Sequence, residues 1–180
     1  MLRVVCLSLA LAAAAPVSAA DKHSHGQPYA GQQGRAISTL SAADIAALET
    51  GKGWGLAKPA ELNGYPGPAH LLELAEEVEL TEEQIIEIEG VFKAMREEAV
   101  TAGRAWLDAE REVDRLFRES VADADSLHAA LRVAAERHMA LRQVHLNAHL
   151  KVAPLLSDHQ RETYAMLRGY AGGHTGHGSQ

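Results

Sequence analysis

The sequence has few cysteines, few aromatic residues and few cationic residues. Of 180 residues, one is cysteine and 4% are aromatic, and 17 Lys and Arg stand against 24 Asp and Glu, which gives a net charge of −7. An acidic chain with few rings lacks the basic patches and stacking platforms of nucleic-acid binding, so no nucleic-acid partner is expected. The sequence also has no G-x-S-x-G, no phosphate-binding loop and no H-E-x-x-H. We therefore predict that the protein is not an enzyme.

Residues 1–20 have the features of a secretory signal peptide. Arg3 precedes an apolar run that ends at Val17, which is too short to span a bilayer stably, and small residues follow up to Ala20. Cleavage removes Cys6 and leaves a chain without thiols or disulfides. No later apolar run approaches the roughly 20 residues that a membrane helix needs. We expect a periplasmic protein with no membrane span after removal of the signal peptide.

The cleavage point decides whether the new N-terminus could hold a metal. Cleavage after Ala20 gives the sequence Asp21-Lys22-His23, in which the amine, two backbone amides and the imidazole supply four nitrogens in a plane for Cu(II) or Ni(II). Cleavage after Ala19 abolishes this arrangement, and small residues also precede that bond. Both cleavage points stay open, and His23 is a secondary candidate ligand.

Residues 21–66 are predicted to form a flexible N-terminal segment with one short helix. Polar sequence without periodicity extends to about Thr39 and is expected to be disordered or loosely attached. Ser41 and Asp44 then form a capping box for a helix over 42–50. The glycines and prolines that follow indicate a turn-rich linker.

Two long series of apolar residues predict the core of the fold. The first follows a capping box at Thr81 and Gln84, and its members alternate at spacings of three and four: Ile85, Ile88, Phe92, Met95, Ala99, Ala102, Trp106, Ala109, Val113 and Leu116. The second has the same alternation: Leu127, Leu131, Ala134, His138, Leu141, His145, Ala148 and Val152. Such series need a partner helix along their length.

The predicted fold class is all-α, with a long antiparallel helical hairpin, shorter flanking helices and disordered termini. The connection over 119–126 is short and polar, so consecutive helices should be antiparallel. The hairpin domain spans 67–170 and includes a helix that begins at Pro68 and a last helix from Ser157 to about Tyr170. Residues 171–180 form a Gly- and His-rich tail that is expected to be flexible.

Ten histidines are many for this length, and three lie together on the second hairpin helix. His138 and His145 occupy positions that face the partner helix, where an apolar residue is expected. His149 follows His145 at H-x3-H spacing, which allows two imidazoles on one helical face to share a metal. With the hairpin turning near residue 122, Glu98 and Met95 of the first helix should border this stretch.

These residues give a candidate metal site and a structural alternative. His145 and His149, assisted by Glu98, His138 or Met95, suit zinc, nickel or copper. A further ligand could come from His70, near the start of the Pro68 helix. The alternative is that histidines facing a partner helix hydrogen-bond a carboxylate or pack without binding anything, and spacing alone does not decide between the two.

The two capping boxes resemble a known motif. Leu80-Thr81-Glu82-Glu83-Gln84 and Leu156-Ser157-Asp158-His159-Gln160 are similar to the LTxxQ pattern of the Spy/CpxP periplasmic stress proteins, which include zinc-resistance-associated and heavy-metal-sensor relatives. The resemblance covers roughly 67–170. It implies a bent helical hairpin that pairs as a homodimer, and partners that are unfolded envelope proteins or a sensor protein.

The resemblance also bears on function. Metal sensors of that group take a histidine from the helix before the second box, and His145 and His149 are similarly placed; where such sensors have two histidines on the first helix, this chain offers only His70, with Leu74 four residues later. We expect a non-enzymatic periplasmic stress protein that binds a divalent transition metal (zinc, nickel or copper) in heavy-metal resistance, sensing or buffering. The alternative is an ATP-independent chaperone or envelope-stress regulator with no metal requirement.

Overall fold

The computed structural model describes residues 28–171. The chain divides into two units, 1–31 and 32–180, and the described part of the first is a turn at Pro28–Gly31. The expected signal peptide, His23 and the tail from 172 onward lie outside the described residues, as does the part of the expected disordered N-terminal stretch before residue 28. Residues 32–171 form helices and turns without a β-strand, so the all-α prediction is confirmed for this part of the chain. No helix within the described range is long and apolar enough to cross a membrane.

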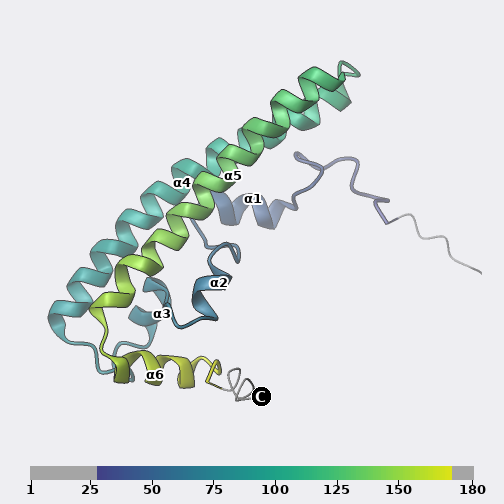
Figure 1. Cartoon of the computed structure of the whole chain (residues 1–180). Helices are drawn as coiled ribbons and strands as arrows, with labels where there is room; N and C mark the ends of the chain where they lie inside the picture. The colour runs from purple at the N-terminus through teal and green to yellow at the C-terminus, as the bar shows by residue number, and fades with distance from the viewer. Residues whose placement is uncertain (1–27, 172–180) are drawn as a thin grey trace, which may run out of the picture. The chain divides into compact units, whose positions relative to one another are not determined.

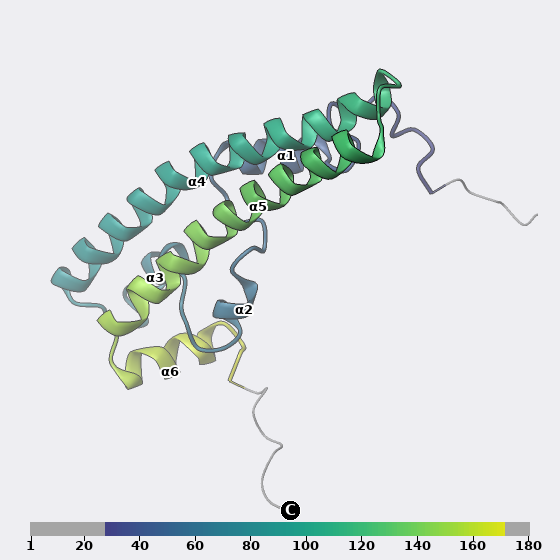
Figure 2. The ribbon, with the colours of Figure 1, turned by 45° about the horizontal axis from the view of Figure 1, so that its top comes forward.

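Two long antiparallel helices form the predicted hairpin. α4 (Glu82–Arg118) and α5 (Ala124–Val152) pack along each other in both views (Figures 1 and 2). Every position of the first apolar series is buried or half-buried. The second series has one exception, Leu131, which is 49% exposed.

The hairpin turns at 119–123, close to the predicted point. Ser120 has a positive φ of 57°, which reverses the chain directly after α4. Asp123 then caps α5: its side chain accepts from the Ser126 amide at 2.8 Å, and the Ser126 hydroxyl accepts from the Asp123 amide at 3.0 Å. From the sequence these residues were predicted only as a polar connection, although they form a fourth capping box beside those at Ser41, Thr81 and Ser157.

The two LTxxQ-like boxes meet in space. The Gln84 side-chain amide donates to Gln160 Oε1, and the Gln160 amide donates to Gln84 Oε1, both at 2.9 Å. Each amide also donates to a backbone carbonyl, Gln84 to Leu155 at 2.7 Å and Gln160 to Glu79 at 3.0 Å. Each glutamine thus caps its own helix and fastens the start of α4 to the start of α6 (Asp158–Leu167). A carboxylate could cap but could not donate, which explains glutamine at both positions.

The N-terminal segment is packed rather than loose from residue 32 onward. Ile37 and Leu40 are buried in the same cluster as Leu48 of α1 (Ala42–Glu49), against the middle of the hairpin. The prediction of a flexible segment over 21–66 therefore does not hold for 32–66, because these apolar side chains complete the core. The predicted linker also contains a short helix, α2 (Lys58–Glu61), where the Gly and Pro pattern predicted turns.

The core consists of two apolar clusters that the hairpin connects. One surrounds Ala99, Trp106 and Leu141 in the middle of α4 and α5. The other gathers Ile88 and Val152 with side chains of α6 and α3 (Pro68–Glu73). A 3-10 turn, η1 (Ala153–Leu155), joins α5 to α6. The stretch between the clusters contains residues 92–95 of α4 and 145–149 of α5.

Candidate metal site

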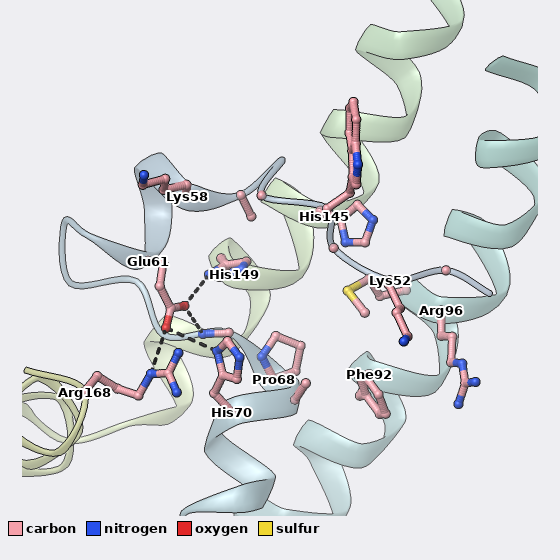
Figure 3. A pocket seen from close by; sticks show the side chains of 18 of the residues that line it. Lys52, Lys58, Glu61, Pro68, His70, Phe92, Arg96, His145, His149 and Arg168 are labelled. Carbon is pink, nitrogen blue, oxygen red and sulfur yellow. Dashed lines mark hydrogen bonds and ion pairs between the residues drawn. The ribbon is translucent and has the colours of Figure 1, made fainter. Parts of the chain in front are cut away.

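A cavity of about 630 Å³ lies at this stretch between the two apolar clusters (Figure 3). His145 and His149 of α5 line it from the hairpin, with Met95 of α4. His70 of α3 and Glu61 of α2 line it from the short helices that precede the hairpin. The fold therefore brings together three predicted histidines, His70, His145 and His149. It adds a carboxylate, Glu61, that no sequence pattern indicated.

His149 is oriented by the backbone. It is 7% exposed, and its Nδ1 is 2.7 Å from the carbonyl oxygen of Tyr65. A carbonyl only accepts, so Nδ1 carries a proton, and the tautomer of the neutral ring is the one with its lone pair on Nε2. A hydrogen bond from the other ring nitrogen to a backbone carbonyl is the usual support of a metal-bound histidine.

Gly67 makes room for this ring. A Cβ at Gly67 would stand 2.9 Å from Cε1 and 3.2 Å from Nε2 of His149, and 3.3 Å from Oε2 of Glu61. Its φ of −85° suits any residue, so the lack of a side chain, rather than backbone freedom, is what the position requires. Glycine thus allows the imidazole and the carboxylate to approach the same point.

His145 is a buried imidazole with an unused nitrogen. It is 3% exposed, and within the described part of the chain its Nε2 has no hydrogen-bond partner. Burial, and to a smaller extent the neighbouring His149, lowers the pKa of His145 below its ordinary value of 6.5. The neutral form, which is the form that can bind a metal, is therefore favoured at pH 7.

The carboxylate of Glu61 makes several polar contacts at the cavity. Its Oε2 accepts from the Gly67 amide at 3.1 Å, and its Oε1 lies 3.3 Å from His70 Nδ1 and 3.6 Å from Arg168 Nε. The Tyr164 hydroxyl donates to the same Oε1. Burial and this hydrogen bond raise the pKa of Tyr164, so the phenol stays protonated and keeps donating.

No sequence pattern marked Glu61. It belongs to a four-residue helix inside a segment rich in Gly and Pro, where neither heptad spacing nor a capping box was visible. The only trace is its distance of nine residues from His70, which becomes a contact because the loop between α2 and α3 folds back.

Two of the predicted ligands are not part of the cavity. Glu98 is exposed and does not line it. The pair Met95 and Ala99 faces α5, and residue 98 is turned about 100° away from Ala99 on the helix. His138 is half-buried and packs on the Trp106 ring, with centroids 4.6 Å apart. It therefore behaves as the packing histidine of the structural alternative.

The cavity gathers potential ligands without closing a coordination shell. Within residues 28–171, no three His, Cys, Asp or Glu side chains are grouped so that they could hold an ion in their present positions. His149 Nδ1 is 3.8 Å from Glu61 Oε2, and His70 is held on the other oxygen of Glu61. What the arrangement offers is two buried imidazoles on one helical turn, with a third imidazole and a carboxylate nearby.

Comparisons with models of protein families, with curated proteins and with solved structures gave no match.

Proposed function

We propose that this protein is a non-enzymatic, periplasmic metal-binding protein that takes up a divalent transition metal at His145 and His149. The proposal rests on one observation: two buried histidines one turn apart line the same cavity as His70 and Glu61. Imidazole with carboxylate is a ligand set that suits zinc, nickel or copper. Heavy-metal buffering or sensing is the role that such a site would serve.

The states of the two histidines support metal binding. His149 donates from Nδ1 to Tyr65, which leaves Nε2 as the ligand nitrogen. His145 has a lowered pKa and an unpartnered Nε2. A buried nitrogen without a partner is costly to the folded protein, and coordination would remove that cost. Glu61 replaces Glu98 as the carboxylate of the proposed site, with His70 as the further imidazole.

The test is calorimetric titration of the full chain with Zn(II), Ni(II) and Cu(II). We expect the protein to bind at least one of these metals and the double variant His145→Ala/His149→Ala to lose that binding. The matched control is His128→Ala/His159→Ala, which changes two exposed histidines on α5 and α6. A second control replaces His23, His25, His174 and His177 together. Binding that survives the cavity variant, or disappears with this terminal variant, would overturn the proposal.

A second candidate function, an ATP-independent holdase, is favoured by exposed apolar side chains of α5. Leu131, Met139 and Leu150 are 49, 63 and 57% exposed and fall within about 100° of arc on the helix. The variant Met139→Ser/Leu150→Ser should then lose suppression of client aggregation, which the double histidine variant should retain. The expected homodimer would bury the same side chains, and sedimentation of both variants separates the two explanations.

A further inference from the structure

The cavity has a cationic lining although the chain as a whole is acidic. Four cationic side chains line it, Lys52, Lys58, Arg96 and Arg168, against the single carboxylate of Glu61. The whole sequence instead has 17 Lys and Arg against 24 Asp and Glu. In Figure 3, Lys58 and Arg168 lie on one side of the histidines, and Lys52 and Arg96 on the other. Positive charge therefore predominates at the cavity.

The protein leaves much of this charge without a counter-ion. In the described part of the chain, Lys52, Lys58 and Arg96 form no ion pair with a carboxylate. Arg168 lies 3.6 Å from Glu61, which is too far for a hydrogen bond, and its Nε is buried without a partner. An anionic ligand that reached this donor would supply the missing acceptor.

Apolar side chains form another part of the lining. Trp54, Phe92, Met95 and Pro68 provide much of the wall, and a volume of about 630 Å³ is that of a site for a small organic molecule. Trp54 has a positive φ of 43°, an uncommon conformation for a bulky residue. Its indole nitrogen donates to Asp44 at 2.8 Å, and this bond fixes the ring beside the cavity.

We propose that the cavity binds a small amphipathic carboxylate, with its charged end among the cationic side chains and its apolar chain against Trp54, Phe92 and Met95. The proposal goes beyond metal binding and does not depend on it, because the cationic side chains are present in the metal-free protein. The two ligands are compatible: the same side chains repel a divalent cation, and a bound carboxylate reduces that repulsion.

The test compares three eight-carbon probes on the metal-free full chain by calorimetry: octanoate, 1-octanol and octylammonium. They share one chain and differ in charge. We expect octanoate to bind at least about tenfold tighter than 1-octanol, the gain that a few partly exposed charge pairs supply, and octylammonium not to bind. Acetate, which carries the charge without the chain, should bind far more weakly than octanoate.

Two variants locate the site. Lys52→Gln/Lys58→Gln should remove most of the preference for octanoate over 1-octanol, whereas Lys93→Gln/Lys151→Gln, which changes two exposed lysines outside the lining, should leave it intact. Octanoate should also change the fluorescence of Trp54, and Trp54→Phe should remove that change and weaken calorimetric binding, because the smaller ring offers the chain less apolar surface. Circular dichroism of each variant verifies that the helical fold is retained.

Three results would overturn the proposal. Equal affinity for octanoate and 1-octanol would show a purely apolar cavity, and equal affinity for octanoate and acetate would show a plain anion site. Octanoate binding that appears only after loading with Zn(II) and is unaffected by Lys52→Gln/Lys58→Gln would make the metal, rather than the protein, the receptor. Failure of metal binding alone leaves the measurement on the metal-free chain unchanged, so the two proposals fail separately.

Discussion

Glu61 connects the elements around the cavity through one carboxylate. It accepts from the Gly67 amide and the Tyr164 hydroxyl, and it lies within ion-pair distance of His70 and Arg168. Its side chain is 11% exposed, so water supplies little of the compensation that its charge needs. These contacts join α2 to α3 and α6, whereas neither apolar cluster contains a residue of α2.

Replacing this carboxylate should destabilise the fold. Glu61→Gln keeps the shape and one acceptor but removes the charge that faces Arg168 and His70. We expect the free energy of unfolding to fall by about 2 kcal/mol, as measured by urea unfolding of the metal-free protein. Glu97→Gln, which changes an exposed carboxylate of α4, should stay within about 0.5 kcal/mol of the parent. Equal effects of the two variants would show that the contacts of Glu61 contribute nothing.

His145 should make stability depend on pH in a defined direction. Its pKa is lower in the folded protein than the ordinary 6.5, so the unfolded chain binds the proton more readily. The contribution of the neutral His145 ring to the free energy of unfolding should therefore be complete above about pH 6.5. It should decrease as the pH drops from 6.5 toward the pKa of the folded protein. His145→Gln should reduce this slope in urea unfolding of the metal-free protein between pH 7.5 and 5. An unchanged slope would contradict the assigned burial of a neutral ring.

At the scale of elements, glutamine and glycine decide how the helices meet. The capping boxes of α4 and α6 share a closed set of amide hydrogen bonds, in which both oxygens of Gln84 and Gln160 accept twice and both nitrogens donate twice. Gly103 of α4 performs a different task, since a Cβ there would stand 2.7 Å from the carbonyl oxygen of Leu48. It allows the end of α1 to touch the backbone of α4.

The paired boxes should be energetically coupled. In a double-mutant cycle with Gln84→Ala and Gln160→Ala, we expect a coupling of about 1 to 2 kcal/mol in the free energy of unfolding, because either change leaves the other amide without its partner. The control cycle pairs Gln84→Ala with Ser126→Ala, in the separate box of α5, and should show a coupling near zero. Additive effects in the first cycle would mean that each box caps its own helix and nothing more.

Two glycines of the same helix should respond to alanine with opposite signs. Gly103→Ala forces α1 away from α4 and should lower the free energy of unfolding by about 1 to 3 kcal/mol. Gly90→Ala meets nothing within 4 Å on an exposed face of α4, and it should raise that free energy by about 0.5 to 1 kcal/mol through helix propensity. Thermal unfolding followed by circular dichroism measures both. A stabilising Gly103→Ala would contradict the close packing of α1 on α4.

At the scale of the molecule, periodic features were predictable and irregular contacts were not. The hairpin, its turn and the paired histidines of α5 follow from heptad spacing and short-range capping. Glu61 and the burial of Ile37 depend on where a loop folds back onto the hairpin, and no local pattern encodes that path. Glu98 was predicted to border the histidines but is exposed. Residue spacing gives the face of a helix only approximately, and a shift of one residue turns a position that faces α5 into an exposed one.

The central claim is that His145 and His149 bind a divalent metal through Nε2. The most direct measurement is long-range ¹H–¹⁵N NMR of the histidine rings during titration of the full chain with Zn(II). Nε2 of both residues should shift to the value of a coordinated nitrogen, while Nδ1 of His149 stays protonated on the Tyr65 carbonyl. Unchanged rings at His145 and His149, with shifts confined to His23, His25, His174 and His177, would contradict it.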